Sequence, residues 1–306
     1  MHVAVTGASG LIGSALVNRL MKNQHRVSRM VRRPAGAGEI SWDPDAGSLD
    51  PEDLEGLDAV VHLAGENIGV RWTKGRKARI RDSRVQGTRL LSEALARTHS
   101  RPQVLVSGSA LGIYGSRGDE VLIESSTLGP ADDFLAVVGQ EWENAAAPAR
   151  AAGIRVVHPR FGVVLSPSGG ALRKMLLPFR LGLGGRLGNG SQWMSWISID
   201  DAAGALLHLV LTATLAGPVN VTAPEPVRNR DFTRTLGRVL SRPTPLPVPA
   251  VALRLVMGEM ADSTLLASAR MLPERLLGSG YRFEHPDLET ALRHVLGMGR
   301  RAILPQ

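Results

Sequence analysis

Met1-His-Val-Ala-Val-Thr-Gly-Ala-Ser-Gly-Leu-Ile-Gly13 opens the chain and determines the fold that we expect for it. The apolar run from Val3 to Val5 predicts a buried strand, and apolar residues recur at helical spacing once the glycines have passed. A strand, a glycine turn and a helix in this order predict a corner that holds a pyrophosphate on the free N–H groups of the helix. An ordinary turn is the alternative interpretation. The residues expected at the ligand are Gly7, Ser9, Gly10, Leu11, Ile12 and Gly13.

The pattern Thr6-Gly-x-x-Gly-x-x-Gly13 resembles the extended short-chain dehydrogenase/reductase superfamily. Other stretches resemble an atypical branch of it, the epimerase family: His62-Leu-Ala-Gly-Glu-Asn-Ile68, Arg71-Trp-Thr73, Ser83-Arg84, Gln192-Trp-Met-Ser-Trp-Ile197 and Leu272-Pro-Glu-Arg-Leu-Leu-Gly-Ser-Gly-Tyr-Arg-Phe283. The resemblance covers about residues 1 to 297. It implies a NAD-dependent epimerase/dehydratase-like protein with a family-specific C-terminal extension.

Strand and helix signals alternate along the chain, which predicts an α/β protein with a Rossmann-type, doubly wound parallel sheet. We expect strands near 2–6, 26–32, 58–63, 103–107 and 154–158, and helices near 11–23, 75–98, 133–152 and 200–214. By resemblance, a smaller C-terminal substrate lobe follows. The expected division is an NADP-binding Rossmann domain at 1–164 plus 200–215, and a lobe with a C-terminal helical extension at 165–199 plus 216–306.

Composition narrows the class of protein. The 306 residues include no cysteine, which excludes disulfides and thiolate chemistry. The chain enters its first strand at once, and no apolar run approaches the about 20 residues needed to span a bilayer. We therefore expect a soluble, cytoplasmic protein without a membrane partner.

The formal net charge of +8 invites a nucleic-acid interpretation. Arginines carry most of the basic charge, however, and they are spread along the whole sequence. The densest basic stretch, residues 71–89, has no interleaved aromatic residue apart from Trp72. We expect no nucleic-acid partner and a small-molecule substrate, with monomer and homodimer both open.

The end of the second predicted strand indicates the cofactor. NAD-binding folds usually place Asp or Glu there for the ribose 2′-hydroxyl. This chain has Arg32-Arg33 instead, with no carboxylate before Glu39, and an arginine pair suits a 2′-phosphate. NADP(H) is therefore the expected cofactor rather than NAD(H), the alternative being a solvated basic strand end. Further expected contacts are the backbone at Leu63, Ala64 and Gly65, the hydroxyl of Ser107 and, by resemblance, Arg84.

The usual proton-transfer pair of these reductases, Tyr-x-x-x-Lys, is missing. The chain has two tyrosines, and the fourth residue after each is Gly118 or His285. Ser109 and Tyr114 lie just after the fourth predicted strand and are the candidate catalytic residues; Tyr114 packing at the cleft edge is the alternative.

The substrate-binding candidates are polar or aromatic residues near the strand ends and in the lobe: Glu66, Arg160, Arg186, Gln192, Trp193 and Trp196. Trp196 in the core, and Asp200 or Asp201 as the N-cap of the following helix, are the competing interpretations. His62 and His158 lie in apolar strands and predict buried histidines. Because the histidines form no H-x-x-x-H pattern, we predict no metal.

These observations predict an NADP(H)-binding, epimerase-like reductase acting on a nucleotide-sugar or another polar carbonyl or hydroxyl substrate. A catalytically inactive NADP(H)-binding sensor or scaffold is the alternative, because the proton-transfer pair is missing.

Overall fold

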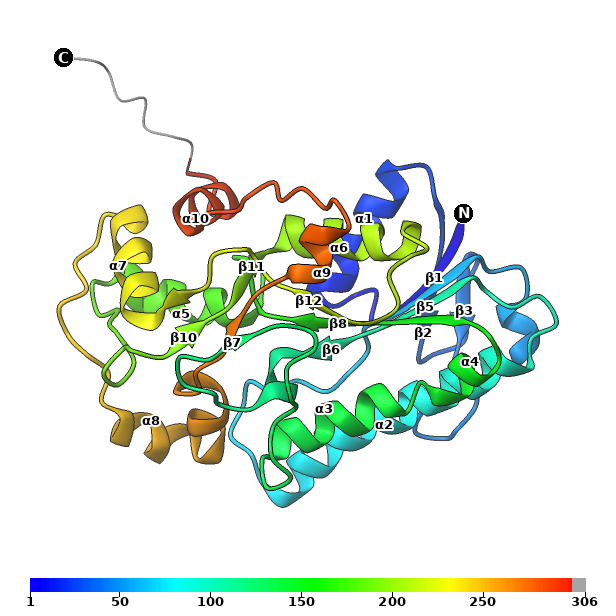
Figure 1. Ribbon diagram of the computed structural model, residues 1–306, viewed down its shortest axis with the longest axis horizontal. Helices are drawn as coiled ribbons and strands as arrows, with labels where there is room; N and C mark the ends of the chain where they lie inside the picture. The colour runs from blue at the N-terminus through cyan, green and yellow to red at the C-terminus, as the bar shows by residue number, and fades with distance from the viewer. Residues whose placement is uncertain (299–306) are drawn as a thin grey trace, which may run out of the picture.

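A computed structural model describes residues 1–298 and is built around one large parallel sheet (Figure 1). The strand order is β12-β8-β5-β4-β1-β2-β3, and β6 pairs with β8 beyond the end of β5. The strands are β1 (His2–Thr6), β2 (Arg26–Val31), β3 (Glu39–Ser41), β4 (Ala59–His62), β5 (Val104–Ser107), β6 (Ser109–Ala110), β8 (Arg155–Phe161) and β12 (Gly217–Val221). The Rossmann-type α/β fold expected from the sequence is confirmed.

Helices cover both faces of the sheet (Figure 1). The central strands therefore bury alternate side chains in two different cores: Val3 and Val5 pack with α1 (Leu11–Lys22) and α6 (Ile199–Leu211). Ala4, between them, packs with residues of α2 (Lys74–Arg97) and α4 (Ala147–Ala151) on the opposite face. Burial on both faces explains why these strands are continuously apolar rather than alternating.

One predicted helix is two helices in the structure. Residues 133–152 form α3 (Phe134–Asn144) and α4, which begins after Ala146. Pro148 lies in the first turn of α4, where its missing N–H is tolerated; inside a continuous helix its ring would clash with the carbonyl of residue 144. The other predicted strands and helices agree with the structure to within a few residues.

A smaller lobe is assembled from later segments, with Trp196, Phe232 and Leu236 at its centre. Its two-stranded sheets pair β9 (Val163–Leu165) with β11 (Trp196–Ser198) and β10 (Trp193–Met194) with β13 (Val227–Arg228). A further pair joins β7 (Val121–Leu122), from the first half of the chain, to β14 (Arg270–Met271). The later helices are α5 (Gly170–Arg180), α7 (Asn229–Leu240), α8 (Ala250–Met257), α10 (Leu288–Val295) and α9 (Glu274–Gly278), whose Leu276 packs in the core of the large sheet. Short helical turns occur at Pro51–Leu54, Leu111–Tyr114 and Ala261–Leu265.

The expected division into two lobes stays a proposal, with one amendment. Residues 217–221, which it assigned to the substrate lobe, form β12 at the edge of the large sheet. Within residues 1–298, none of the helices combines the length and apolar character that crossing a bilayer requires.

Candidate cofactor and substrate site

The glycine corner connects β1 to α1 and has no room for side chains. Gly7 has a φ of +64°, and a Cβ there would lie 2.9 Å from the backbone of Leu63 and Ala64. A Cβ on Gly13 would lie 2.1 Å from the carbonyl oxygen of Gly7, well inside contact distance. Both glycines are therefore required by close backbone approach, as the sequence predicts.

The N-terminus of α1 offers unpaired donors to a ligand. Its N-cap is Gly10, which supplies no side-chain cap, and its first turn contains no acidic residue. Ser9 and Gly10 are exposed, while Leu11 and Ile12 are half-buried beside them. An anion at this position would meet free N–H groups and the positive end of the helix.

Thr6 connects the exits of two neighbouring strands. Its hydroxyl oxygen accepts the N–H groups of Leu63 at 3.0 Å and Ala64 at 3.2 Å. The hydroxyl proton is then free for the Nδ1 atom of His62 at 2.7 Å, so this buried imidazole carries its own proton on Nε2. Burial, reinforced by the positive charge of Arg84, lowers the pKa of His62 to about 4. His62 is therefore a neutral structural group that orients the Thr6 hydroxyl, which in turn holds the N–H groups of Leu63 and Ala64.

The two arginines after β2 differ in their ion pairs. Arg33 makes a two-pronged ion pair with Glu39, both N–O distances being 2.7 Å. Arg32 is exposed and has no ion pair with any described residue. Arg32 is therefore the better candidate of the two for a 2′-phosphate, because the charge of Arg33 is already balanced.

Arg84 lies directly beneath the exit of β4. A Cβ on Gly65 would lie 3.3 Å from the centre of its guanidinium group, and the same group stands 5.1 Å from the ring of Trp142. One guanidinium nitrogen donates to the carbonyl oxygens of Glu66 and Ile80, both at 3.0 Å. Burial lowers the pKa of Arg84 to about 10, which leaves it charged near neutral pH. A half-buried cation thus supports the backbone expected to contact the cofactor.

The two candidate catalytic residues belong to a buried polar network. The Tyr114 side chain is fully buried, donates to Asn220 Oδ1 at 2.8 Å and accepts from Arg160 at 2.8 Å. Ser109 donates to Glu143 at 2.7 Å, and Glu143 accepts two further bonds from Arg160 at 2.8 Å. Burial raises the pKa of Tyr114. This geometry gives no support to a catalytic role for Tyr114 or Ser109, or to substrate contact by Arg160.

Aligned with the superfamily, the missing Tyr-x-x-x-Lys pair would fall on α3, either at Phe134 and Val138 or at Leu135 and Gly139. A Cβ on Gly139 would stand 2.9 Å from the Cβ of Ile113, so a lysine does not fit at that position without movement of the chain. Val138, the other candidate position, is buried. At the same edge, Ser107 is fully buried at the end of β5, and its hydroxyl has no hydrogen-bond partner among the described residues.

The substrate candidates do not share one environment. Glu66 pairs with Arg76, beside the exit of β4. Trp196 is fully buried, and its ring N–H donates to the carbonyl oxygen of Glu225, so it belongs to the core rather than to a binding surface. Asp201 is not the N-cap of α6: Ser198 takes that place, because its hydroxyl accepts the Asp201 N–H.

A cleft of about 550 Å³ lies in the smaller lobe, next to the substrate candidates Gln192 and Trp193. Gln192 lines it, held by bonds to two backbone carbonyls. Trp193 lies beside it between two guanidinium groups, those of Arg228 and Arg270, at 4.6 and 4.5 Å from its ring. Its indole N–H donates to Asp119 at 2.8 Å. Arg186 is exposed and borders a separate, smaller hollow.

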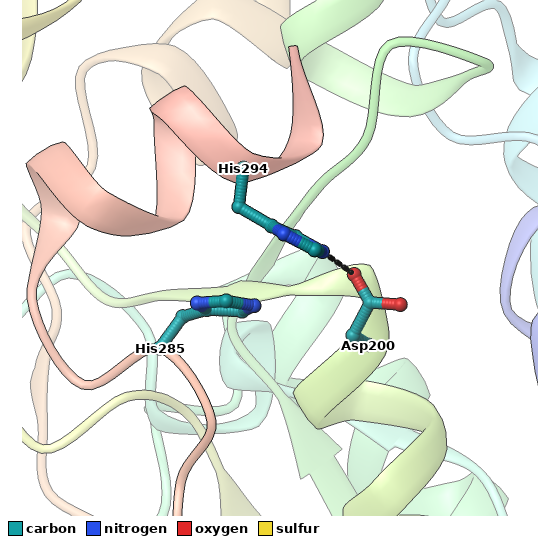
Figure 2. A group of neighbouring side chains, drawn as sticks. All are labelled: Asp200, His285 and His294. Atoms are coloured by element: carbon teal, nitrogen blue, oxygen red, sulfur yellow. Dashed lines mark hydrogen bonds and ion pairs between the residues drawn. The ribbon is translucent and has the colours of Figure 1, made fainter. Parts of the chain in front are cut away.

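Sequence reasoning missed several residues of these environments. Glu143, Asn220 and Arg228 come from elements remote in sequence from the residues that they contact, and no local pattern singles them out. It also missed a group formed by Asp200, His285 and His294, whose potential ligand atoms lie within 4.8 Å of one another (Figure 2). The histidine spacing had predicted no metal.

Two family models match the chain. The model described as the NAD dependent epimerase/dehydratase family matches residues 3–221, and a domain of unknown function, DUF1731, matches residues 248–295. An epimerase family protein of Mycobacterium bovis is 46% identical over 295 residues, which cover 96% of this chain and 97% of the relative.

Solved structures of related proteins resemble this chain over nearly its whole length. The crystal structure of the human epimerase family protein SDR39U1 with NADPH has a TM-score of 0.89 and 35% identity, covering 97% of this chain and 99% of that one. A nucleoside-diphosphate sugar epimerase from Corynebacterium glutamicum has a TM-score of 0.81 and 38% identity, covering 97% of this chain and 58% of that one.

Proposed function

The chain belongs to the NAD dependent epimerase/dehydratase family, and on that premise we propose that it binds NADP(H) at the glycine corner. The human relative of similar length was crystallised with NADPH, which supports this cofactor. The observation that carries the proposal is the open N-terminus of α1 beside Gly7 and Gly13, where any side chain would collide with backbone.

In this proposal Arg32 contacts the 2′-phosphate, and the backbone of Leu63, Ala64 and Gly65 lies along the cofactor. The half-buried Arg84 supports that backbone through its bond to the Glu66 carbonyl. A bound dinucleotide supplies hydride-transfer chemistry. The protein contributes the anion site, the fixed backbone and, at the end of β5, the unpartnered hydroxyl of Ser107.

Titration of the protein with NADPH and NADH tests the cofactor assignment. A charge-assisted hydrogen bond contributes about 1.5–3 kcal/mol, so Arg32→Ala should weaken NADPH binding roughly 10- to 100-fold and leave NADH binding unchanged. Arg33→Ala should have a smaller effect, because Glu39 already balances its charge. Arg29→Ala, which removes an exposed arginine from β2 itself, is the matched control. Equal affinity of the wild-type protein for the two cofactors would contradict the proposal.

We further propose that the substrate is a polar, nucleotide-linked sugar or another carbonyl or hydroxyl compound. The cleft beside Trp193 supports this class, because its walls carry Asp119, Arg228 and Arg254. Transfer of deuterium from C4-deuterated NADPH to a carbonyl compound, or epimerisation of a nucleotide sugar in the presence of NADP+, would establish turnover. Arg228→Ala should then raise KM and leave the NADPH affinity unchanged.

A second candidate, an NADP(H)-binding sensor or scaffold without catalysis, is favoured by a specific observation. The tyrosine nearest the expected reaction centre is buried with its hydroxyl bonded to Asn220 and Arg160. In addition, the sequence contains no Tyr-x-x-x-Lys pair. NADPH binding with neither deuterium transfer nor epimerisation across the whole panel would select this second candidate.

A further inference from the structure

Two histidines and one aspartate from separate parts of the chain converge on the surface between α6 and α10 (Figure 2). Asp200 lies in the first turn of α6, His294 lies in the last turn of α10, and His285 lies in the segment that leads into α10. The Nε2 atom of His294 stands 3.1 Å from Asp200 Oδ2. The two imidazole rings stack with centroids 4.1 Å apart.

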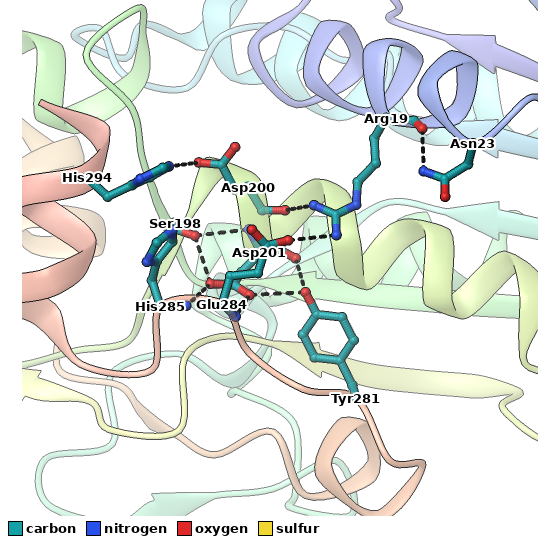
Figure 3. Close-up of polar contacts among 9 residues, drawn as sticks. All are labelled: Arg19, Asn23, Ser198, Asp200, Asp201, Tyr281, Glu284, His285 and His294. Carbon is teal, nitrogen blue, oxygen red and sulfur yellow. Dashed lines mark hydrogen bonds and ion pairs between the residues drawn. The ribbon is translucent and has the colours of Figure 1, made fainter. Parts of the chain in front are cut away.

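The backbones that carry these side chains are held firmly relative to one another (Figure 3). Asp201, the neighbour of Asp200, is fully buried, and its carboxylate accepts the N–H groups of Glu284 at 2.8 Å and His285 at 3.0 Å. The Tyr281 hydroxyl donates to the same carboxylate at 3.1 Å. The segment that carries His285 is thereby tied to the first turn of α6.

The third side chain is anchored through its helix. α10 buries Leu288 and Leu292 in the core of the smaller lobe, which fixes the side of α10 from which His294 projects. Arg19 on α1 completes the frame, since it donates to the backbone carbonyl of Asp200 and pairs with Glu284 at 2.7 Å. All three candidate ligands therefore start from fixed positions.

The hydrogen bond between His294 and Asp200 accounts for one imidazole and leaves the other without a partner in the described part of the chain. The Nε2 atom of His285 is buried and has no hydrogen-bond partner among the described residues. An imidazole with a free ring nitrogen, next to a second imidazole and a carboxylate, is a donor set that divalent zinc prefers.

We propose that Asp200, His285 and His294 bind a divalent cation of the zinc class, with water in the fourth position. Tetrahedral ligands at about 2.0–2.1 Å from a metal stand about 3.3 Å apart. The present ligand-atom separations are at most 4.8 Å, so metal binding requires them to shorten by up to about 1.5 Å. The ion joins the C-terminal extension to the first turn of α6, where it stabilises the docking of α10. This site shares no residue with the proposed cofactor site.

Cobalt(II) and zinc are the probes for the test, with untagged protein that has been treated with chelator and dialysed. Cobalt should produce the intense visible d–d absorption of a tetrahedral site at a stoichiometry of one, and zinc should displace it. Zinc should also raise the midpoint of thermal unfolding. Loss of a second-shell partner costs 10- to 100-fold in metal affinity, so His285→Gln and His294→Gln should each weaken binding by at least about 100-fold.

His99→Gln, which changes an exposed histidine elsewhere, is the matched control and should keep the wild-type affinity. NADPH titration of every variant shows that it is folded and separates this proposal from the cofactor proposal. Two outcomes would overturn the metal site: no tetrahedral cobalt spectrum in the wild-type protein, or a spectrum that persists unchanged in both histidine variants.

Discussion

Replacing Tyr114 by phenylalanine tests whether its hydroxyl group has a structural or a catalytic role. The hydroxyl has one proton, which goes to Asn220 Oδ1 at 2.8 Å rather than to the Ile123 carbonyl at 3.2 Å. It also accepts a bond from Arg160 at 2.8 Å. Tyr114→Phe therefore leaves one buried amide oxygen and one guanidinium N–H without their partners, while both Glu143 bonds to Arg160 remain.

The expected loss follows from those two groups. A buried polar group left without a partner costs about 1–3 kcal/mol, and part of the amide's cost is recovered if Asn220 turns toward other donors. We expect Tyr114→Phe to lower the free energy of unfolding by about 2–4 kcal/mol in urea titrations. The pair Tyr114→Phe and Asn220→Ala should couple by about 0.5–3 kcal/mol in a double-mutant cycle.

The function of the variant decides the question. Because burial keeps the phenol protonated, Tyr114 cannot serve as a base near neutral pH, and we expect NADPH affinity and any deuterium transfer to survive the substitution. Loss of transfer by 100-fold or more, with stability within about 0.5 kcal/mol of the wild type, would refute this reasoning and restore Tyr114 as a catalytic residue.

Three further perturbations have defined outcomes. Glu143→Ala should destabilise the fold by about 3–5 kcal/mol in urea titrations, because it leaves the guanidinium of Arg160 buried without its counterion; the neutral Glu143→Gln should cost less, and equal costs would contradict the ion-pair argument. Gly13→Ala should abolish NADPH binding in the titration, since its Cβ would meet the Gly7 carbonyl at 2.1 Å, whereas Gly278→Ala, with open space around it, should bind normally. Burial lowers the pKa of both His62 and His158 to about 4, from 6.5 in the unfolded chain, so the unfolded state binds more protons between these values. Stability should therefore decrease as the pH falls from 6.5 to 4, by up to about 1.4 kcal/mol per pH unit for each histidine. His62→Gln should reduce that slope in pH-dependent unfolding. An unchanged slope would show that His62 is not a source of the pH dependence.

The cofactor corner was predictable because its signals are local. Gly7, Gly10 and Gly13 lie within one strand–helix turn, and their spacing alone specifies where backbone must approach backbone. The break between α3 and α4 was visible in the same way, as Pro148, although the sequence interpretation treated the region as one helix.

The burial of the polar candidates was not predictable from local pattern. Tyr114 finds Asn220 across 106 residues, and that contact exists only because β12 pairs with β8 at the sheet edge. The same holds for Asp200 and His294, which are 94 residues apart. Spacing rules for metal ligands detect helices and turns that carry several ligands, and they miss ligands that the tertiary fold brings together.

The buried carboxylate of Asp201 has a consequence for the synthesis of the chain. Three of its four described partners, the Tyr281 hydroxyl and the N–H groups of Glu284 and His285, are encoded 80, 83 and 84 residues later. The fourth, the Ser198 hydroxyl, precedes it in the chain. At a translation rate of about 5–20 residues per second, the ribosome needs roughly 4 to 17 s to add the three later partners after Asp201. The first turn of α6 therefore acquires its full set of hydrogen bonds only after the C-terminal segment has been made.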